Sequence, residues 1–470
     1  MPNVRPKRVV WITTDHMRYD CIAAHGNPAM HTPNLDRLVN EGVSFEHCYV
    51  QNPLCMPSRA SFMTGLYPQQ TGVTANGHCL RPDFKPTVAT TFSAGGFQTV
   101  QIGKLHFQPH EDNDLDPRPR HDYGFDIFWP SEEPGPYEDA YMTWLRTEHP
   151  EWVETFRVPR SISPRRTEER EGRVLDAPWL GSHTGWIAET MSRFLHPGAL
   201  ARCRRPRQFV HLGFYAPHPP LNPTREMFEP YENADIPEPI WQEDEWADKP
   251  EPLAGMLQSM TNWDSPQFLK YRRHFYAMVT GVDMAVGRLL EQLGAQGMLE
   301  DTLIVFSSDH GDHCGDHRMI TKDISYYDAL VRMPCVLFWP GGLGTEGRRV
   351  GELVEMVDLL PTLLELAGCP VPEVMVGRSY ADALRTRQPI PGREDVLAYH
   401  EPGNAMLRTK THKYIRYGSG AEVLYDLTER PMEVRNRTRD DPAILAEMRE
   451  RMLQRLLDAG RSPQPRLYRF

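Results

Sequence analysis

The 470-residue sequence has no apolar run long enough to cross a bilayer, and its first eight residues contain no apolar segment either. A membrane-spanning helix needs about 20 consecutive apolar residues, and a secretory leader needs a shorter apolar core behind a positive end. We therefore expect a cytoplasmic protein without a membrane partner.

Cysteine is scarce and scattered along the chain. The eight cysteines include no pair with the C-x-x-C spacing of redox or metal motifs. Because no export signal is visible, free thiols are expected rather than a disulfide framework.

Positive charge is in deficit. Lysine and arginine number 52 against 63 aspartate and glutamate residues, which gives a formal net charge of −11. Binding of nucleic acid needs a cationic face, so we expect no nucleic-acid partner. An acidic protein that acts on an anionic substrate must gather its positive charge locally.

What the sequence does contain is an alternation of short apolar strands with amphipathic helices. This is the pattern of an α/β sheet that is covered on both faces. We expect a large mixed, mostly parallel sheet sandwiched by helices. The periodicity predicts strands at 9–13, 43–49, 99–102, 208–214, 302–307 and 336–339, and helices at 32–39, 87–94, 274–293 and 358–366.

The chain divides into a main domain over 1–380 and a smaller α+β subdomain over 381–470. Strands at 395–399 and 413–417 and a final helix near 443–457 predict a small antiparallel sheet with a terminal helix. Two stretches, near 108–206 and 221–268, are rich in proline and charge and weakly periodic. We interpret them as insertions at the rim of the sheet, where specificity usually lies.

The run Cys55-Met56-Pro57-Ser58-Arg59 places a thiol at a predicted helix start. Pro57 favours the first turn of a helix, so Cys55 should stand at the positive helix end. Arg59 lies about one turn further and can face the same pocket. A nucleophile, a helix terminus and a guanidinium together suit the hydrolysis of an oxyanion ester. Taken alone, Cys55 is also typical of a buried free cysteine.

Two Asp-His pairs follow predicted strands: Asp15-His16 after residues 9–13, and Asp309-His310 after residues 302–307. Active sites of open α/β sheets lie beyond the carboxyl ends of the strands, so both pairs can converge on one divalent cation. Either pair by itself is also typical of a turn or a helix cap.

A ligand-rich string follows the second pair and would allow an independent zinc site. Neighbours in an extended loop rarely all reach one ion, so we expect most of them to be supporting or surface groups. The string consists of Asp312, His313, Cys314 and Asp316.

Residues 55–59 resemble the maturation motif Cys-x-Pro-x-Arg of the type I, formylglycine-dependent sulfatases, which belong to the alkaline phosphatase-like superfamily. Phosphonate monoester hydrolases and choline sulfatases are close relatives of that family. Residues 96–106 resemble its second signature, which ends in Gly-Lys followed by a histidine, although Phe97 replaces the usual tyrosine. Residues 424–436 resemble its C-terminal strand motif. The resemblance runs from about residue 9 to 436 without the two insertions.

The resemblance implies that a formylglycine-generating maturation enzyme oxidises Cys55 to formylglycine, whose hydrated aldehyde is the nucleophile. It also implies one divalent metal ion, held by Asp15, Asp309, His310 and the oxygen at position 55. The fourth family ligand is usually Asp, Asn or Gln, but His16 stands there. Oxygen shells suit Ca²⁺, whereas imidazole suits Mn²⁺, Zn²⁺ or Fe²⁺. Because the resemblance is to sulfatases, we expect Ca²⁺ first and Mn²⁺ next.

The resemblance assigns roles to further side chains. Arg59 would help to activate the nucleophile, Lys104 would bind a sulfonyl oxygen, and His106 would serve as a base. The alternative is an exposed lysine and a capping histidine.

Three residues complete the expected site. His218, between two prolines, would contact the leaving-group oxygen, and Lys322 matches the family lysine that bridges substrate and nucleophile. Asn76 is expected to line the substrate pocket. Loop side chains that face solvent are the alternative for His218 and Lys322.

The reaction expected is hydrolysis of a sulfate monoester to an alcohol and sulfate. The alternatives are a phosphonate monoester or phosphodiester hydrolase with the same site, and a non-catalytic binding protein that is never matured. A small anionic ester is the expected substrate. The sequence is compatible with a homo-oligomer. Four tryptophans of the first insertion would either stack on the alcohol or pack the insertion onto the core: Trp129, Trp144, Trp152 and Trp179.

Overall fold

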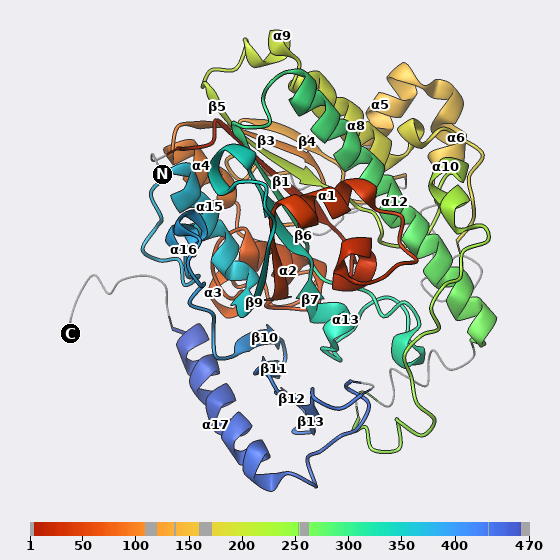
Figure 1. The fold of residues 1–470 in the computed structure, drawn as a ribbon, viewed down its shortest axis with the longest axis vertical. Coiled ribbons are helices and arrows are strands. Elements are labelled where there is room, and N and C mark those ends of the chain that lie inside the picture. The colour runs from red at the N-terminus through yellow and green to blue at the C-terminus, as the bar shows by residue number, and fades with distance from the viewer. Residues whose placement is uncertain are drawn as a thin grey trace.

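The computed structural model describes residues 4–108, 120–135, 138–158, 172–251, 253, 263–430 and 432–461. Its centre is a nine-stranded sheet in the order β4-β3-β5-β1-β6-β8-β2-β7, with β9 paired to β2 (Figure 1). The strands are β1 (Arg8–Thr14), β2 (Val43–Tyr49), β3 (Phe97–Gly103), β4 (Ile127–Pro130), β5 (Arg207–Gly213), β6 (Thr302–Ser308), β7 (Arg332–Met333), β8 (Cys335–Phe338) and β9 (Arg348–Glu355).

The direction of the strands brings several strand exits to one edge. β4, β3, β5, β1 and β6 are mutually parallel, whereas β8 runs antiparallel to both β6 and β2. The two reversals leave β2 running in the same direction as β6. The segments that follow β1, β2, β3, β5 and β6 therefore all leave the sheet at its carboxyl edge. This architecture confirms the expected mixed, mostly parallel sheet.

Helices cover both faces of the sheet (Figure 1). Side chains alternate between two buried clusters: Val9 and Trp11 of β1 belong to one, and Val10 and Ile12 to the other. The first cluster packs beneath α2 (Cys55–Phe62), α4 (Val88–Ala94) and α15 (Leu359–Ala367). The second packs beneath α1 (Pro33–Glu41), α8 (His183–Phe194) and α12 (Ser265–Ala295).

Shorter elements connect these layers. The short α-helices are α3 (Pro68–Thr71), α5 (Ala140–Glu148), α6 (Val153–Phe156), α9 (Pro197–Leu200), α10 (Arg225–Phe228), α13 (Asp328–Val331), α14 (Pro340–Leu343) and α16 (Ala381–Thr386). Turns of 3-10 helix occur at Tyr19–Cys21, Ala23–His25, Pro150–Trp152, Trp179–Gly181, Glu229–Tyr231, Asp316–Arg318 and Met356–Asp358. Within the described ranges, no helix combines the length and the apolarity that a bilayer crossing requires.

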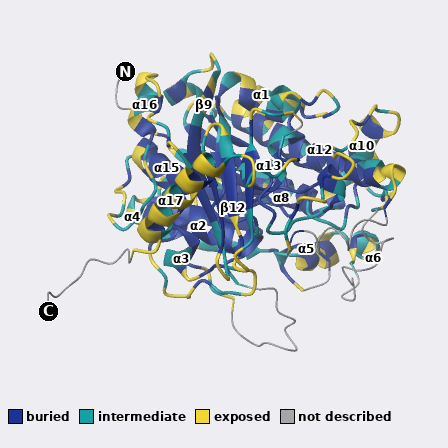
Figure 2. Ribbon diagram, turned by 90° about the horizontal axis from the view of Figure 1, so that it is seen from below, coloured by how far each residue is buried: buried dark blue, intermediate teal, exposed yellow. Residues whose placement is uncertain are grey.

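The C-terminal part forms the expected small antiparallel sheet, in the order β10-β11-β12-β13, with α17 (Pro442–Ala459) against it. One face of this sheet packs on the main core and the other packs on α17, whose outer side is exposed (Figure 2). The backbone N–H of Tyr399 donates to the carbonyl of Gln51 at 2.8 Å, close to Cys55 in the sequence. The strands are β10 (Val396–His400), β11 (Asn404–Arg408), β12 (His412–Arg416) and β13 (Glu422–Asp426).

The first predicted insertion is partly built into the core. β4 extends the main sheet beside β3, and α8 packs on α12. The sequence did not indicate β4 because a four-residue edge strand that ends in Pro130 is too short to show a periodicity. The division at residue 380 and the rim insertions stay predictions, and residues 109–119, 159–171 and 254–262 lie outside the described ranges.

Candidate active site

Residues from distant parts of the chain meet at the carboxyl edge of the sheet. The ligand atoms of Asp15, Cys55, Asp309 and His310 all lie within 4.8 Å of one another. A second group overlaps with it and is formed by Asp15, His16, Cys55 and His218. Asp15, Asp309 and His310 are completely buried.

Cys55 is the first residue of α2. The helix begins two residues earlier than Pro57 indicated, with Leu54 as its extended N-cap. Pro57 still lies in the first turn, where its missing N–H costs nothing. Burial and the charge of Asp15 raise the pKa of Cys55 to about 11. The unmodified side chain is therefore a thiol at neutral pH and a poor nucleophile.

Asn76 supports this helix start. Its Oδ1 accepts a hydrogen bond from the backbone N–H of Met56 at 3.1 Å, directly after Cys55. Ser58 donates from Oγ to the carbonyl of Asp309 at 2.5 Å. These bonds hold the first turn of α2 against the loop that follows β6.

Two lysines supply the local positive charge. Lys104 Nζ lies 2.7 Å from Asp15 Oδ2. Lys322 Nζ donates to Cys55 Sγ and lies 3.1 Å from His310 Nε2. Burial alone would raise the pKa of Asp15, but Lys104 and Lys322 hold it well below its ordinary value. The carboxylate therefore remains ionised between two ammonium groups.

The backbone that delivers Lys104 requires glycine at two positions. Gly103 has a φ of +91°, which L side chains rarely adopt. A Cβ added to Gly213 would lie 1.9 Å from the carbonyl oxygen of Lys104. Strands β3 and β5 can thus approach closely at their ends, and Lys104 turns toward Asp15.

Arg59 is fully buried and binds Asp309. Its Nε donates to Asp309 Oδ2 at 2.7 Å, and its Nη atoms donate to the carbonyls of Lys104 and Thr14 at 3.1 and 3.3 Å. The guanidinium therefore joins the exits of β1, β3 and β6. These contacts position Asp309, whereas the sequence had led us to expect that Arg59 helps to activate the nucleophile at position 55.

The histidines differ in how their rings are held. His310 Nδ1 donates to the carbonyl of Gly311 at 2.9 Å, which leaves a lone pair on Nε2, 3.1 Å from Cys55 Sγ. Burial lowers the pKa of His310 to about 4, so this ring is neutral at pH 7. His218 Nδ1 donates to the carbonyl of Pro219 at 2.6 Å. His106 donates from its backbone N–H to Glu132 Oε1 at 3.0 Å.

Two residues near the cluster, Tyr215 and Glu133, were not selected from the sequence. The ring centroid of Tyr215 lies 5.0 Å from Lys104 Nζ and 4.6 Å from the ring of His218. Burial raises the pKa of Glu133; the charge of Lys104 opposes this shift, and the charge of Asp15 adds to it. Tyr215 directly precedes the segment with His218, which was the one signal available for it.

The donor set fits a divalent ion. His16 Nε2 is buried and has no hydrogen-bond partner among the described residues, and it lies 3.8 Å from Asp15 Oδ1. Buried polar atoms are normally paired, so an unpaired ring nitrogen beside carboxylates indicates a missing ligand. Carboxylate oxygens and neutral imidazoles are ordinary metal ligands.

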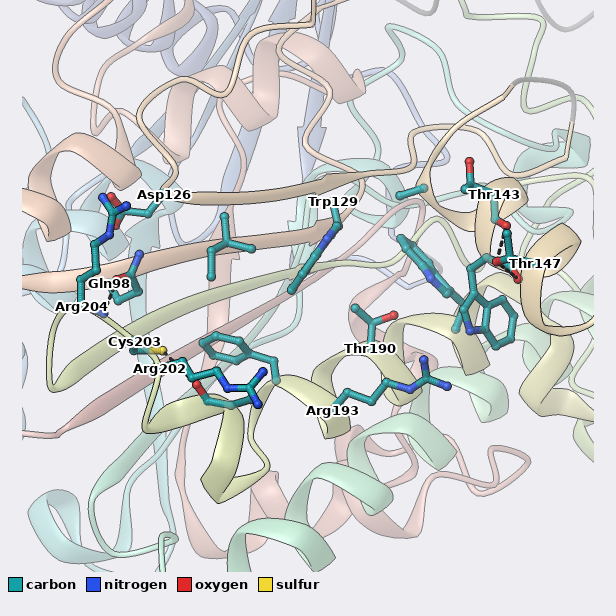
Figure 3. A pocket seen from close by; sticks show the side chains of 16 residues that line it. Gln98, Asp126, Trp129, Thr143, Thr147, Thr190, Arg193, Arg202, Cys203 and Arg204 are labelled. Carbon is teal, nitrogen blue, oxygen red and sulfur yellow. Dashed lines mark hydrogen bonds between the residues drawn. The ribbon is translucent and has the colours of Figure 1, made fainter.

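A cavity of about 790 Å³ lies apart from this cluster, between the outer strand β4 and the helices α5 and α8 (Figure 3). Trp129, Trp144 and Arg193 are among the residues that line it. It shares no lining residue with the cluster around Cys55. Two of the tryptophans considered for stacking on a substrate therefore line a separate cavity.

Comparison with known proteins places this centre in a family. The sulfatase family model matches residues 7–369, and a model described as N-sulphoglucosamine sulphohydrolase, C-terminal, matches residues 315–461. An arylsulfatase from Clostridium perfringens is 30% identical over 453 residues, which cover 91% of this chain and 89% of that protein.

Two further relatives show the breadth of the likeness. The multifunctional alkaline phosphatase superfamily protein PehA of Trinickia caryophylli is 27% identical over 490 residues, covering 94% of this chain and 93% of that protein. The crystal structure of a phosphonate monoester hydrolase of Agrobacterium radiobacter has a TM-score of 0.80 at 26% identity, covering 97% of this chain and 95% of that one. With the family model and the arylsulfatase aligned along most of its length, the chain belongs to the sulfatase family and is a sulfuric ester hydrolase.

Proposed function

We propose that the chain hydrolyses a small sulfate monoester to an alcohol and sulfate, with a formylglycine made from Cys55 by a maturation enzyme. The observation that carries the proposal is the meeting of Cys55 with Asp15, Asp309 and His310 between two lysines. A thiol with a pKa of about 11 is poorly suited to attack, which supports its conversion. Formylglycine supplies a hydroxyl of its hydrated aldehyde as the nucleophile.

Asp15, His16, Asp309 and His310 would hold one divalent ion, which adds positive charge beside the sulfonyl group when bound. Lys104 and Lys322 would bind the sulfonyl oxygens, because both ammonium groups already face the cluster. Charge that develops on these oxygens then meets prepositioned positive groups. Arg59 keeps the Asp309 carboxylate oriented throughout.

His218 would donate the proton to the departing alcohol. Its Nδ1–H is held by the carbonyl of Pro219, so His218 would donate from Nε2 as the imidazolium. Because burial lowers the pKa of the ring, Nε2 would take up that proton when the anionic ester binds beside it. His106 would take the proton that must leave the hydrate when sulfate is expelled. Lys322, beside Cys55, could assist at the leaving group.

Replacing His218 by Asn is expected to slow alkyl sulfates by about 10²- to 10⁴-fold, because a poor leaving group needs a proton in the transition state. An aryl sulfate with an acidic phenol should be slowed much less. The measurement is kcat for both esters. As a control, His211→Asn removes a buried ring that pairs with Thr13 Oγ1 at 2.9 Å, and it should affect both esters alike. Equal losses for both esters in His218→Asn would contradict the assigned role.

A second activity, hydrolysis of phosphonate monoesters, is favoured by two observations. A phosphonate monoester hydrolase aligns over 97% of this chain with a TM-score of 0.80. By the resemblance described above, His16 also stands where sulfatases usually have Asp, Asn or Gln. An imidazole ligand suits Mn²⁺, Zn²⁺ or Fe²⁺ better than Ca²⁺. We expect kcat/KM for 4-nitrophenyl sulfate to exceed that for 4-nitrophenyl phenylphosphonate on the same preparation. The opposite order would make the phosphonate the main substrate.

A further inference from the structure

The ligand-rich string after His310 does not form a metal site of its own. His313 Nε2 pairs with Asp323 at 3.2 Å, and His317 Nδ1 pairs with Glu245 at 2.8 Å. Asp316 binds Arg18 and Arg272. These side chains thus pair with residues outside the cluster around Cys55, whereas Asp312 contacts His16 of that cluster.

Asp312 is completely buried and binds the ring of His16. Its Oδ2 lies 2.9 Å from His16 Nδ1 and also accepts the hydroxyl of Tyr271 at 2.9 Å. Its Oδ1 accepts the backbone N–H groups of Cys314 and Thr321 at 2.8 and 3.0 Å. Four donors therefore fix the position of the carboxylate, and the carboxylate fixes the ring of His16.

The partners of the two imidazoles determine which ring nitrogen carries hydrogen. A carboxylate can only accept from His16 Nδ1, and a carbonyl can only accept from His310 Nδ1. Each ring thus keeps its lone pair on Nε2. Of these two Nε2 atoms, that of His16 is buried and has no hydrogen-bond partner among the described residues.

The rings of His16 and His310 pack edge to face. Their centroids are 4.6 Å apart, and the two ligand groups that contain them share Asp15 and Cys55. Each of the two ligand groups adds one of these imidazoles to the shared Asp15, so an ion at the shared residues would meet imidazole nitrogen as well as carboxylate oxygen. Ca²⁺ prefers oxygen ligands, whereas Mn²⁺ and Zn²⁺ accept nitrogen and oxygen together.

We propose that Asp312 and Tyr271 act through His16 to make this centre select a transition-metal ion such as Mn²⁺ or Zn²⁺ over Ca²⁺. The inference rests on the proposed metal-dependent function and reverses the order of ions expected from the sequence. Asp312 is a positioning residue here: it orients the ring and strengthens its basicity, as carboxylates bound to metal-ligating histidines do.

The test is direct binding of each ion to metal-free protein. Dissociation constants for Mn²⁺, Zn²⁺ and Ca²⁺ are measured by titration calorimetry against competing chelators. We expect wild type to bind Mn²⁺ and Zn²⁺ more tightly than Ca²⁺. Asp312→Asn should weaken Mn²⁺ and Zn²⁺ about 10- to 100-fold while leaving Ca²⁺ nearly unchanged. Tyr271→Phe should act in the same direction and less strongly.

Two further variants distinguish a change in metal-ion selectivity from a loss of folded structure. His16→Asp replaces the nitrogen ligand by oxygen and should shift the preference toward Ca²⁺. Glu245→Gln alters a carboxylate on a histidine of the same loop, with a contact of 2.8 Å outside both ligand groups, and should leave all three constants unchanged. Thermal unfolding of the metal-free variants verifies that each one is folded.

Three outcomes would count against the inference. Tightest binding of Ca²⁺ by wild type would overturn it, and sulfatase activity with Ca²⁺ alone would then leave the proposed function standing. An equal weakening of all three ions by Asp312→Asn would show a merely structural role. Binding of no divalent ion by wild type would overturn both the inference and the metal-dependent function.

Discussion

Replacing Cys55 by Ala is expected to abolish sulfate ester hydrolysis and to reduce kcat by about 10⁴-fold or more. Losses of this size are found when the nucleophile of an enzyme is removed. The reason is that Cys55 is the one side chain in the cluster that can be converted into the proposed nucleophile. Its neighbours Asp15, His310 and Lys322 contact its Sγ and fix the position of the side chain. The measurement is single-turnover and steady-state hydrolysis of an aryl sulfate.

Cys48→Ala is the matched control for this loss. Cys48 is equally buried in β2, where its Sγ contacts Met356 Sδ at 3.3 Å. A small stability loss and normal turnover are expected from it. Substantial turnover by Cys55→Ala would contradict the role of position 55.

Arg59→Leu is expected to lower the free energy of unfolding by about 3–5 kcal/mol, because it leaves the buried carboxylate of Asp309 without its partner. Arg59 and Asp309 are both fully buried, and the guanidinium also binds two backbone carbonyls. Activity should be lost as well, since Asp309 is then no longer held in the cluster. Urea unfolding of the metal-free protein measures the change.

Arg193→Leu supplies the comparison for Arg59. Arg193 binds Glu148 at 2.6 Å with its side chain 52% exposed, so solvent screens the pair. Removal should change the free energy of unfolding by about 0–1 kcal/mol. If the two variants were equally stable, Arg59 would not hold the strand exits together.

The strands of the sheet could be read from the sequence because parallel strands buried on both faces form continuous apolar runs. The prediction for residues 43–49 coincides with β2 (Val43–Tyr49). The helix predicted at 274–293 begins earlier, at Ser265, because Asp264 and Gln267 form a capping box ahead of the apolar stripe. β9 was missed because Arg348, Arg349 and Glu352 leave it without a continuous apolar run.

The motif residues of the site were predictable, but their supporting contacts were not. Cys55 and the two Asp-His pairs could be selected because each follows a strand or starts a helix. The bond between His16 and Asp312 joins residues 296 positions apart, and Tyr271 lies inside a long helix without any motif. Such pairs depend on how α12 packs across the sheet, which local patterns do not encode.

Mass spectrometry of the peptide that contains position 55, taken from preparations of graded activity, tests the central claim most directly. We expect the fraction of aldehyde at this position to rise in proportion to kcat, with zero activity at zero aldehyde. Full sulfatase activity in a preparation whose Cys55 is entirely thiol would contradict the account.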